Sequence, residues 1–254
     1  MSHFYALEDN NVRFLPDVHT PAQARKTPGI VCSSVTTKLA IAPNPFLDNW
    51  GKEQLVKYAR QYPDKHYAVI KNMMYGFRID VDGTRVTSAQ FGTSVHKALE
   101  DALNVSTRGE YTPDESPYSL FVNPFMQWFA DEDMQILATE QMVGDEKRLV
   151  AGTIDVVARN CAGQVVLLDF KTRDCKGKNP GEKTYEKDLL QLAVEADIVK
   201  NIHGLSYTPR IASVVIDAST GNTAVKWWTV KAQAKGEFLF DAINTFYNAF
   251  ILRI

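Results

Sequence analysis

The chain has 254 residues, of which 45% are apolar and 23% are charged, and its formal net charge is −2. This composition excludes a disordered chain, a collagen-like chain and a disulfide-stabilised miniprotein. The near-zero net charge argues against a protein that coats nucleic acid nonspecifically, and the lack of an 18-residue apolar run predicts no transmembrane helix.

The N-terminal part of the chain is predicted to be an irregular arm followed by a mainly helical segment. Residues 1–29 contain several prolines and show little periodicity, which favours an irregular arm or a short packed strap. A short extended piece from Ile30 then leads into a helix, with Ser34 or Thr36 as its N-cap. Apolar residues at helical spacing predict further helices over 49–61, 91–103 (with Thr93 as N-cap) and 124–131.

The C-terminal part is predicted to alternate strands with two helices. The expected elements are strands over 135–143, 149–158 and 164–171, a helix over 186–200, strands over 211–217 and 223–230, and a helix over 233–250. The third strand is almost wholly apolar, which is typical of a central strand. The order predicts an α+β (or α/β) fold with one central mixed sheet flanked by helices. Residues 30–254 would form a single domain, mainly helical over 30–130, with the sheet core and closing helices over 131–254.

Two carboxylates and a lysine are predicted to meet at one end of this sheet. Asp169 and Lys171 are two residues apart on a strand, so both side chains leave the same face. Asp155 precedes Asp169 across one tight turn, and a hairpin of that length can bring the two together. Such a group suits Mg²⁺ or Mn²⁺, which could lower the pKa of a bound water. Taken alone, the Asp-x-Lys pattern also fits a surface ion pair at a strand end.

Two further side chains are candidates on predicted helices. His96 lies beside the apolar stripe of its helix, and Glu100, four residues later, could hold its tautomer. Taken alone, such a histidine is more often packed or solvated than a ligand. Gln191 follows the basic segment on the helix over 186–200, and taken alone it reads more readily as a solvent-facing residue.

Together these residues resemble a known nuclease family. The motifs are Gly92-Thr93-x-x-His96-x-x-x-Glu100, Gly152-x-x-Asp155, Asp169-x-Lys171 and Gln191. In order and spacing they resemble the PD-(D/E)xK nucleases of the RecB type over about residues 91–195. The upstream segment Pro28-Gly29-Ile30-x-x-x-Ser34-Val35-Thr36-Thr37, followed by Leu47-x-x-Trp50, is similar to mitochondrial genome maintenance exonucleases and their phage relatives.

The resemblance implies a restriction-endonuclease-like core and a divalent metal site. The metal would be Mg²⁺ or Mn²⁺. Its implied ligands are His96, Asp155, Asp169 and the backbone carbonyl of Phe170, and the implied catalytic residues are Asp155, Asp169, Lys171 and Gln191. Glu140 matches an acidic position often seen in the family. The family's QxxxY tyrosine is replaced by Glu195 here, and Tyr185 could substitute for it. Some relatives carry an iron–sulfur cluster on four cysteines, and the three cysteines of this chain argue against one.

The charges are distributed unevenly along the chain. Residues 110–146 contain nine acids and no Lys or Arg, whereas residues 171–187 contain six bases against three acids. This pattern fits two solvated surfaces, or a basic rim for a phosphate backbone beside an acidic, metal-holding region. The candidate nucleic-acid contacts in the basic segment are Arg173, Lys176, Lys178, Tyr185 and Lys187. Aromatic side chains that could stack bases, or else pack in the core, are Trp50, Tyr58, Phe125 and Trp128.

The expected function is that of a metal-dependent DNA exonuclease on single-stranded or frayed ends. The alternatives are a noncatalytic DNA-binding subunit of a repair or recombination complex, and a structure- or sequence-specific endonuclease. No Walker A motif is present, so the partners besides DNA would include a helicase, recombinase or single-strand-binding protein, with no membrane. The sparse cysteines and the absence of a targeting pattern predict a cytoplasmic location in a bacterial or phage-infected cell.

Overall fold

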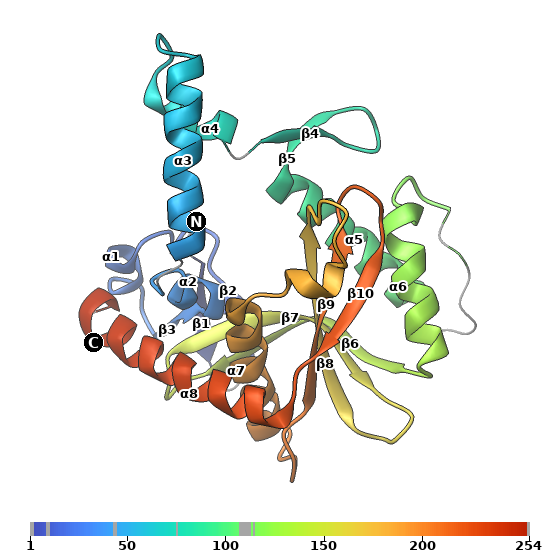
Figure 1. Ribbon diagram of the computed structural model, residues 1–254. Helices are drawn as coiled ribbons and strands as arrows, with labels where there is room; N and C mark the ends of the chain where they lie inside the picture. Colours follow the sequence, from blue (N-terminus) through green and yellow to red (C-terminus); the bar gives the residue numbers. More distant parts are fainter. Residues whose placement is uncertain are drawn as a thin grey trace.

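A central mixed sheet covered by helices on both faces forms the body of the protein (Figure 1). The computed structural model describes residues 3–8, 11–42, 45–74, 76–106, 113 and 115–252. The predicted α+β class is confirmed. No helix in the described ranges is long and apolar enough to cross a membrane.

The sheet has eight strands in the order β10-β9-β8-β7-β3-β1-β2, with β6 also paired to β7. The pairs β8–β9 and β3–β7 are parallel, and the other neighbours are antiparallel. The strands are β1 (Phe4–Glu8), β2 (Asn11–Phe14), β3 (Ile30–Ser34), β6 (Gln135–Asp145), β7 (Val150–Arg159), β8 (Val165–Arg173), β9 (Arg210–Asp217) and β10 (Thr223–Trp227). A separate hairpin joins β4 (Phe77–Ile79) to β5 (Arg85–Thr87).

The helices divide between the two faces of the sheet and an arm that stands away from it (Figure 1). Helices α2, α7 and α8 pack on one face and α5 and α6 on the other, while α3 and α4 make up the arm. The helices are α1 (Pro21–Ala24), α2 (Val35–Leu39), α3 (Pro45–Gln61), α4 (Tyr67–Met74), α5 (Ser88–Ser106), α6 (Ser119–Asp131), α7 (Glu186–Ile202) and α8 (Val230–Phe246). A short 3₁₀ turn spans Pro180–Lys183, and a π-helical stretch, Tyr247–Leu252, continues α8.

The prediction of an irregular arm over residues 1–29 is wrong. Strands β1 and β2 extend the central sheet, and β1 pairs with both β2 and β3. Residues Phe4 and Ala6 pack in one apolar cluster while Tyr5 and Leu7 pack in another, so both faces of β1 are covered. The apolar run of this strand is too short to reveal its period, and the rest of the segment, with three prolines, favoured an irregular structure.

Several predicted boundaries shift once the elements pack. Ser34 is the N-cap of α2, as predicted, and its hydroxyl accepts the backbone N–H of Thr37 at 2.9 Å. Thr93 is not an N-cap, because α5 already begins at Ser88 and the Thr93 hydroxyl donates to a carbonyl within the helix. Helix α6 begins at Ser119 and includes Pro124, and α8 begins at Val230.

Strand β8 is buried on both sides, as predicted for a central strand. Its residues Val165 and Leu167 pack toward α7, whereas Val166, Leu168 and Phe170 pack toward α5 and α6. Because β8 packs between two apolar clusters, the position of its polar C-terminal end is fixed.

Candidate active site

Strands β7 and β8 separate at Asp155, which creates the candidate site. Their ladder ends with Val156 opposite Leu168. Beyond that pair, the carboxylate of Asp155 accepts the backbone N–H of Phe170 at 2.5 Å. The alternation of β7 also changes here, because Ile154 packs in the α7 cluster and Val156 in the α5–α6 cluster. The separation of β7 from β8 leaves the Asp155 carboxylate at the opening between the two strands.

Asp169 and Lys171 lie on one face of β8, as their spacing predicts. The Lys171 Nζ atom donates to Asp169 Oδ1 at 2.7 Å. From α7, Gln191 bridges the two: its Nε2 donates to Asp169 Oδ1 at 3.2 Å, and its Oε1 accepts from Lys171 Nζ at 3.3 Å. Gln191 is buried rather than solvent-facing, and it fixes the orientation of the ion pair.

Helix α5 brings His96 to the same opening from the other face of the sheet. Gly92 permits this close approach, because a Cβ atom there would lie 2.7 Å from Thr172 Oγ1 of β8. The His96 Nδ1 atom lies 3.7 Å from Asp155 Oδ2, and the ring packs edge-on to Phe170 at 5.7 Å between centroids.

Burial sets the charges of the central groups. It raises the pKa of both Asp155 and Asp169, with the Lys171 ammonium opposing that rise. Burial alone would lower the pKa of Lys171, but attraction to the two carboxylates outweighs it and raises that pKa. The carboxylates are thus costly to ionise without a nearby cation, and Lys171 stays charged.

His96 is held in its neutral form. Burial lowers the pKa of His96 to about 4, a shift that attraction to Asp169 and the backbone of Phe170 only partly opposes. A neutral imidazole is the form that binds metal ions.

Glu100 and Glu140, the two acids predicted to have supporting roles, differ in their contacts. Glu100 forms an ion pair at 3.0 Å with Lys97, three residues before it. This ion pair replaces the expected contact between Glu100 and His96, which would have held the His96 tautomer. Glu140 faces the site: burial, Asp155 and Glu100 raise its pKa to about 7. Its backbone has a φ of 48°, which is uncommon for a residue with a side chain and typical of strained functional sites.

Sequence reasoning did not place Glu195 in the site. Its Oε1 accepts from Gln191 Nε2 at 3.2 Å, and the side chain is 1% exposed. Gly152 makes room for it, because a Cβ at that position would lie 2.9 Å from Glu195 Oε1. Burial and the Asp169 carboxylate raise the pKa of Glu195 well above its usual value. Its spacing, one helical turn after Gln191 on the buried face of α7, is the signal that could have found it.

The donor atoms fit a hard divalent cation, although they are not preassembled around one. In the described part of the chain, no group of three or more His, Cys, Asp or Glu side chains is arranged to hold a metal ion. Asp169 Oδ1 is taken by Lys171 and Gln191, whereas its Oδ2 is buried without a hydrogen-bond partner. Such an atom needs a cation or a donor. Two carboxylates, an imidazole and a nearby backbone carbonyl form a donor set that Mg²⁺ or Mn²⁺ accepts.

The predicted nucleic-acid contacts divide into structural and exposed residues. Arg173 has structural contacts. Its guanidinium donates to the Lys183 carbonyl and to Asp188 at 2.7 Å, and it lies over the Tyr185 ring at 4.1 Å. Lys187 donates to the carbonyl of Ala42 at 3.2 Å. Lys176 and Lys178 are exposed in the loop between β8 and α7, and half of the Tyr185 side chain is accessible.

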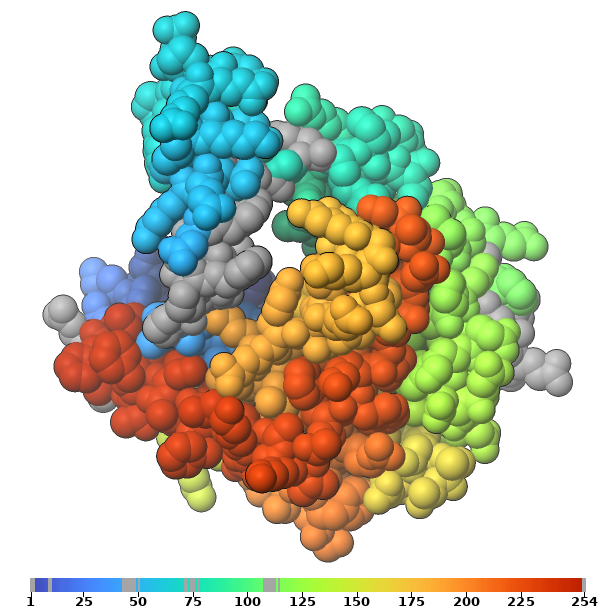
Figure 2. All heavy atoms as spheres, viewed as in Figure 1, coloured from blue at the N-terminus to red at the C-terminus, as the bar shows by residue number. Residues whose placement is uncertain are grey.

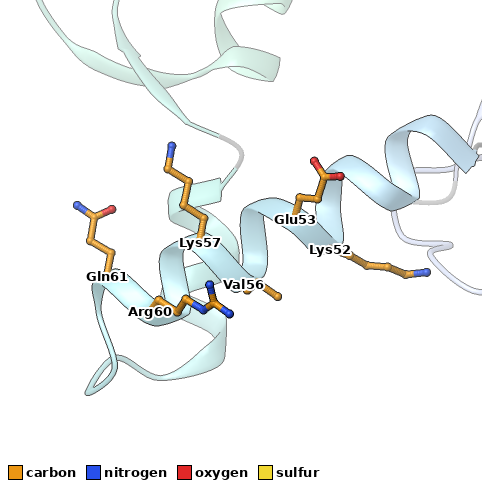
Figure 3. A pocket seen from close by; sticks show the side chains of 6 residues that line it. All are labelled: Lys52, Glu53, Val56, Lys57, Arg60 and Gln61. Carbon is orange, nitrogen blue, oxygen red and sulfur yellow. The ribbon is translucent and has the colours of Figure 1, made fainter.

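The arm carries a second basic surface that sequence reasoning did not single out. A groove of about 750 Å³ runs along α3 (Figure 3), and in the space-filling view an open gap separates the arm from the loop over 174–185 (Figure 2). The groove is lined by Lys52, Glu53, Val56, Lys57, Arg60 and Gln61. Three cations against one carboxylate make this face basic.

The aromatic candidates are mostly core residues. Phe125 is fully buried, and Trp128 packs between Phe125 and Trp227. On the arm, Tyr58 stacks on Tyr62 with 6.4 Å between ring centroids. The side chain of Trp50 lies outside the described residues.

Comparison with protein-family models finds no match, and comparison with curated proteins finds none either. Among solved structures, the chain is similar to the crystal structure of SSO0001, with 11% identity and a TM-score of 0.34 over 84% of this chain and 80% of that one. It is also similar to a candidate exonuclease from Eubacterium rectale, with 13% identity and a TM-score of 0.34 over 79% of this chain and 65% of that one. The chain thus spans about two thirds of the second protein.

Proposed function

We propose that the protein is a metal-dependent deoxyribonuclease of the PD-(D/E)xK type that degrades single-stranded or frayed DNA from its ends. The observation that carries this proposal is the group formed by Asp155, Asp169, Lys171 and Gln191 where β7 and β8 separate. A partly buried ammonium bonded to a buried carboxylate, beside an unpartnered carboxylate oxygen, is costly as a purely structural feature.

Each residue of the site has a distinct role in this proposal. Asp155, Asp169, His96 and the Phe170 carbonyl would hold Mg²⁺ or Mn²⁺, which supplies positive charge to the scissile phosphate and acidifies a water molecule. Lys171, fixed by Asp169 and Gln191, would orient the attacking water and neutralise charge that develops on the phosphate. Gln191 keeps the ammonium in place, and no iron–sulfur cluster takes part.

Two basic surfaces support DNA as the substrate. Lys176 and Lys178 are exposed beside the site, and the groove on α3 adds Lys52, Lys57 and Arg60. Such cations follow a phosphate backbone without reading sequence. The preference for single-stranded ends is carried over from the family resemblance. A helicase, recombinase or single-strand-binding protein would be a fitting partner, since each acts on exposed single strands.

Digestion of end-labelled linear single-stranded DNA, compared with a closed single-stranded circle, tests the proposal. The reactions contain Mg²⁺, Mn²⁺ or EDTA. We expect loss of the linear strand only, and only with metal. Cutting of the circle would instead indicate an endonuclease. Retained DNA binding with no cutting in either metal would indicate the noncatalytic DNA-binding subunit.

Replacement of His96 by alanine is expected to raise the Mn²⁺ concentration for half-maximal cleavage by about tenfold or more, because a neutral nitrogen ligand is lost. The measurement is a Mn²⁺ titration of cleavage rate. His203→Ala is the control, because this histidine is exposed at the end of α7. An unchanged midpoint in His96→Ala would leave His96 with only its packing role against Phe170.

A further inference from the structure

The side-chain amide of Gln191 is fully hydrogen-bonded inside the candidate active site. Its Oε1 accepts from Lys171 Nζ at 3.3 Å, and its Nε2 donates both to Asp169 Oδ1 and to Glu195 Oε1, at 3.2 Å each. A primary amide has two N–H donors, so each of them has an acceptor here. Glu195, one turn further along α7, therefore completes the set of contacts that fixes this amide.

Glu195 helps to decide which way round the amide lies. Rotation of the amide by half a turn exchanges its oxygen and its nitrogen with almost no change in shape. In that reversed orientation, the NH₂ group would face the Lys171 ammonium and the oxygen would face Glu195. Without an acceptor at residue 195, the observed orientation would leave one N–H of Gln191 buried and unpaired, because the other acceptor, Asp169 Oδ1, is already shared with Lys171. The preference for the orientation that serves Lys171 would then be smaller.

The position of Glu195 is costly for a residue with no further role. The side chain is 1% exposed, and its Oε2 atom is buried without a hydrogen-bond partner. Its neighbours along α7, Val194 and Ala196, are buried apolar residues. Gly152 of β7 leaves space for the carboxyl group, because a Cβ atom there would lie 2.9 Å from Glu195 Oε1. An apolar side chain avoids the cost of burying a carboxyl group, so stability alone does not account for a glutamate here.

We infer that Glu195 is a positioning residue for the nuclease reaction. It holds the Gln191 amide with its oxygen toward Lys171, and Gln191 in turn keeps the ammonium beside Asp169. Glu195 contacts neither metal nor DNA in this scheme and acts only through Gln191. The inference rests on the proposed function, because Lys171 is the residue that orients the attacking water there.

Three substitutions of Glu195 separate the contact from the charge and the size of the side chain. Glu195→Gln keeps an acceptor oxygen, and because burial raises the pKa of Glu195 well above its usual value, the neutral amide is also a close electrostatic match. Glu195→Met keeps the length without an acceptor, and Glu195→Asp keeps the carboxyl group but is one methylene too short to reach Gln191. In single-turnover cleavage we expect a rate close to wild type for the glutamine variant and a rate about 10–100-fold lower for the other two, with unchanged DNA affinity.

A double-mutant cycle with Gln191→Met tests whether Glu195 acts through Gln191. If it does, adding Glu195→Met to Gln191→Met lowers the rate no further. Effects that multiply in the double variant, or equal rates for Glu195→Gln and Glu195→Met, would overturn the inference. Melting curves recorded without metal identify any variant that does not fold, and Glu195→Asp replaces Glu195→Met in both comparisons if the methionine variant is one of these.

Nuclear magnetic resonance of the metal-free protein tests the same contact without DNA cleavage. The Gln191 side-chain NH₂ signals are assigned by their absence in Gln191→Met, and two buried, hydrogen-bonded protons should exchange slowly with water. We expect Glu195→Gln to preserve this slow exchange and Glu195→Met to accelerate it. Unchanged exchange in Glu195→Met would contradict the inference. A wild-type protein that shows the expected exchange pattern but cleaves no DNA would instead refute the proposed function, while the role of Glu195 in holding Gln191 would stand.

Discussion

Replacement of Lys171 by alanine is expected to lower the rate of DNA cleavage by about 10³-fold, because the fixed ammonium that offsets charge in the transition state is lost. The side chain is held by Asp169 and Gln191, and a flexible surface lysine cannot take over that position. Folding and DNA binding should be largely retained, because backbone contacts position the strand itself.

The Lys171 variant is measured by single-turnover cleavage of a labelled single strand in Mn²⁺, with DNA binding followed separately in Ca²⁺. Lys178→Ala is the matched control, since it removes an exposed lysine seven residues further along the chain. It should weaken binding most at low salt, reduce the salt dependence of binding and leave the chemical step unchanged. Near wild-type turnover in Lys171→Ala would mean that the assignment of this strand as catalytic is wrong.

Replacement of Asp155 by asparagine is expected to abolish both cleavage and stabilisation by metal. A metal present at a hundred times its dissociation constant adds about 2.7 kcal/mol to the free energy of unfolding. For a domain of this size, such a gain raises the melting temperature by roughly 5–10 °C. Asparagine can still accept the Phe170 N–H, so the strands should stay in place while the metal loses a charged ligand.

Melting temperatures measured with and without Mn²⁺ test this second prediction without relying on activity. The control is Asp101→Asn, which changes an exposed carboxylate on α5 that pairs with Lys97, and it should retain the full shift. Loss of the shift in Asp155→Asn alone supports the metal site. An unchanged shift in that variant would place the metal elsewhere or exclude Asp155 as a ligand.

The sequence by itself determined the C-terminal half of the fold and the centre of the site. Period-two alternation and tight turns act between near neighbours, so strands β6 to β8 and the shared face of Asp169 and Lys171 follow from local spacing. Local spacing did not predict the strands within residues 1–29. Strand β1 is short, and what holds it is pairing with β3, more than twenty residues away.

Only the tertiary structure decided which distant side chains meet. The approach of His96 to Asp155 depends on α5 packing at Gly92, and the burial of Gln191 and Glu195 depends on α7 lying over the opening in the sheet. The environment of Lys38 also depends on distant residues, because this lysine is fully buried and donates to Asn244 and Asn248 near the other end of the chain. Local spacing fixes the direction in which a side chain leaves its own element. Its neighbours, its burial and its pKa depend on contacts between elements that are remote in sequence.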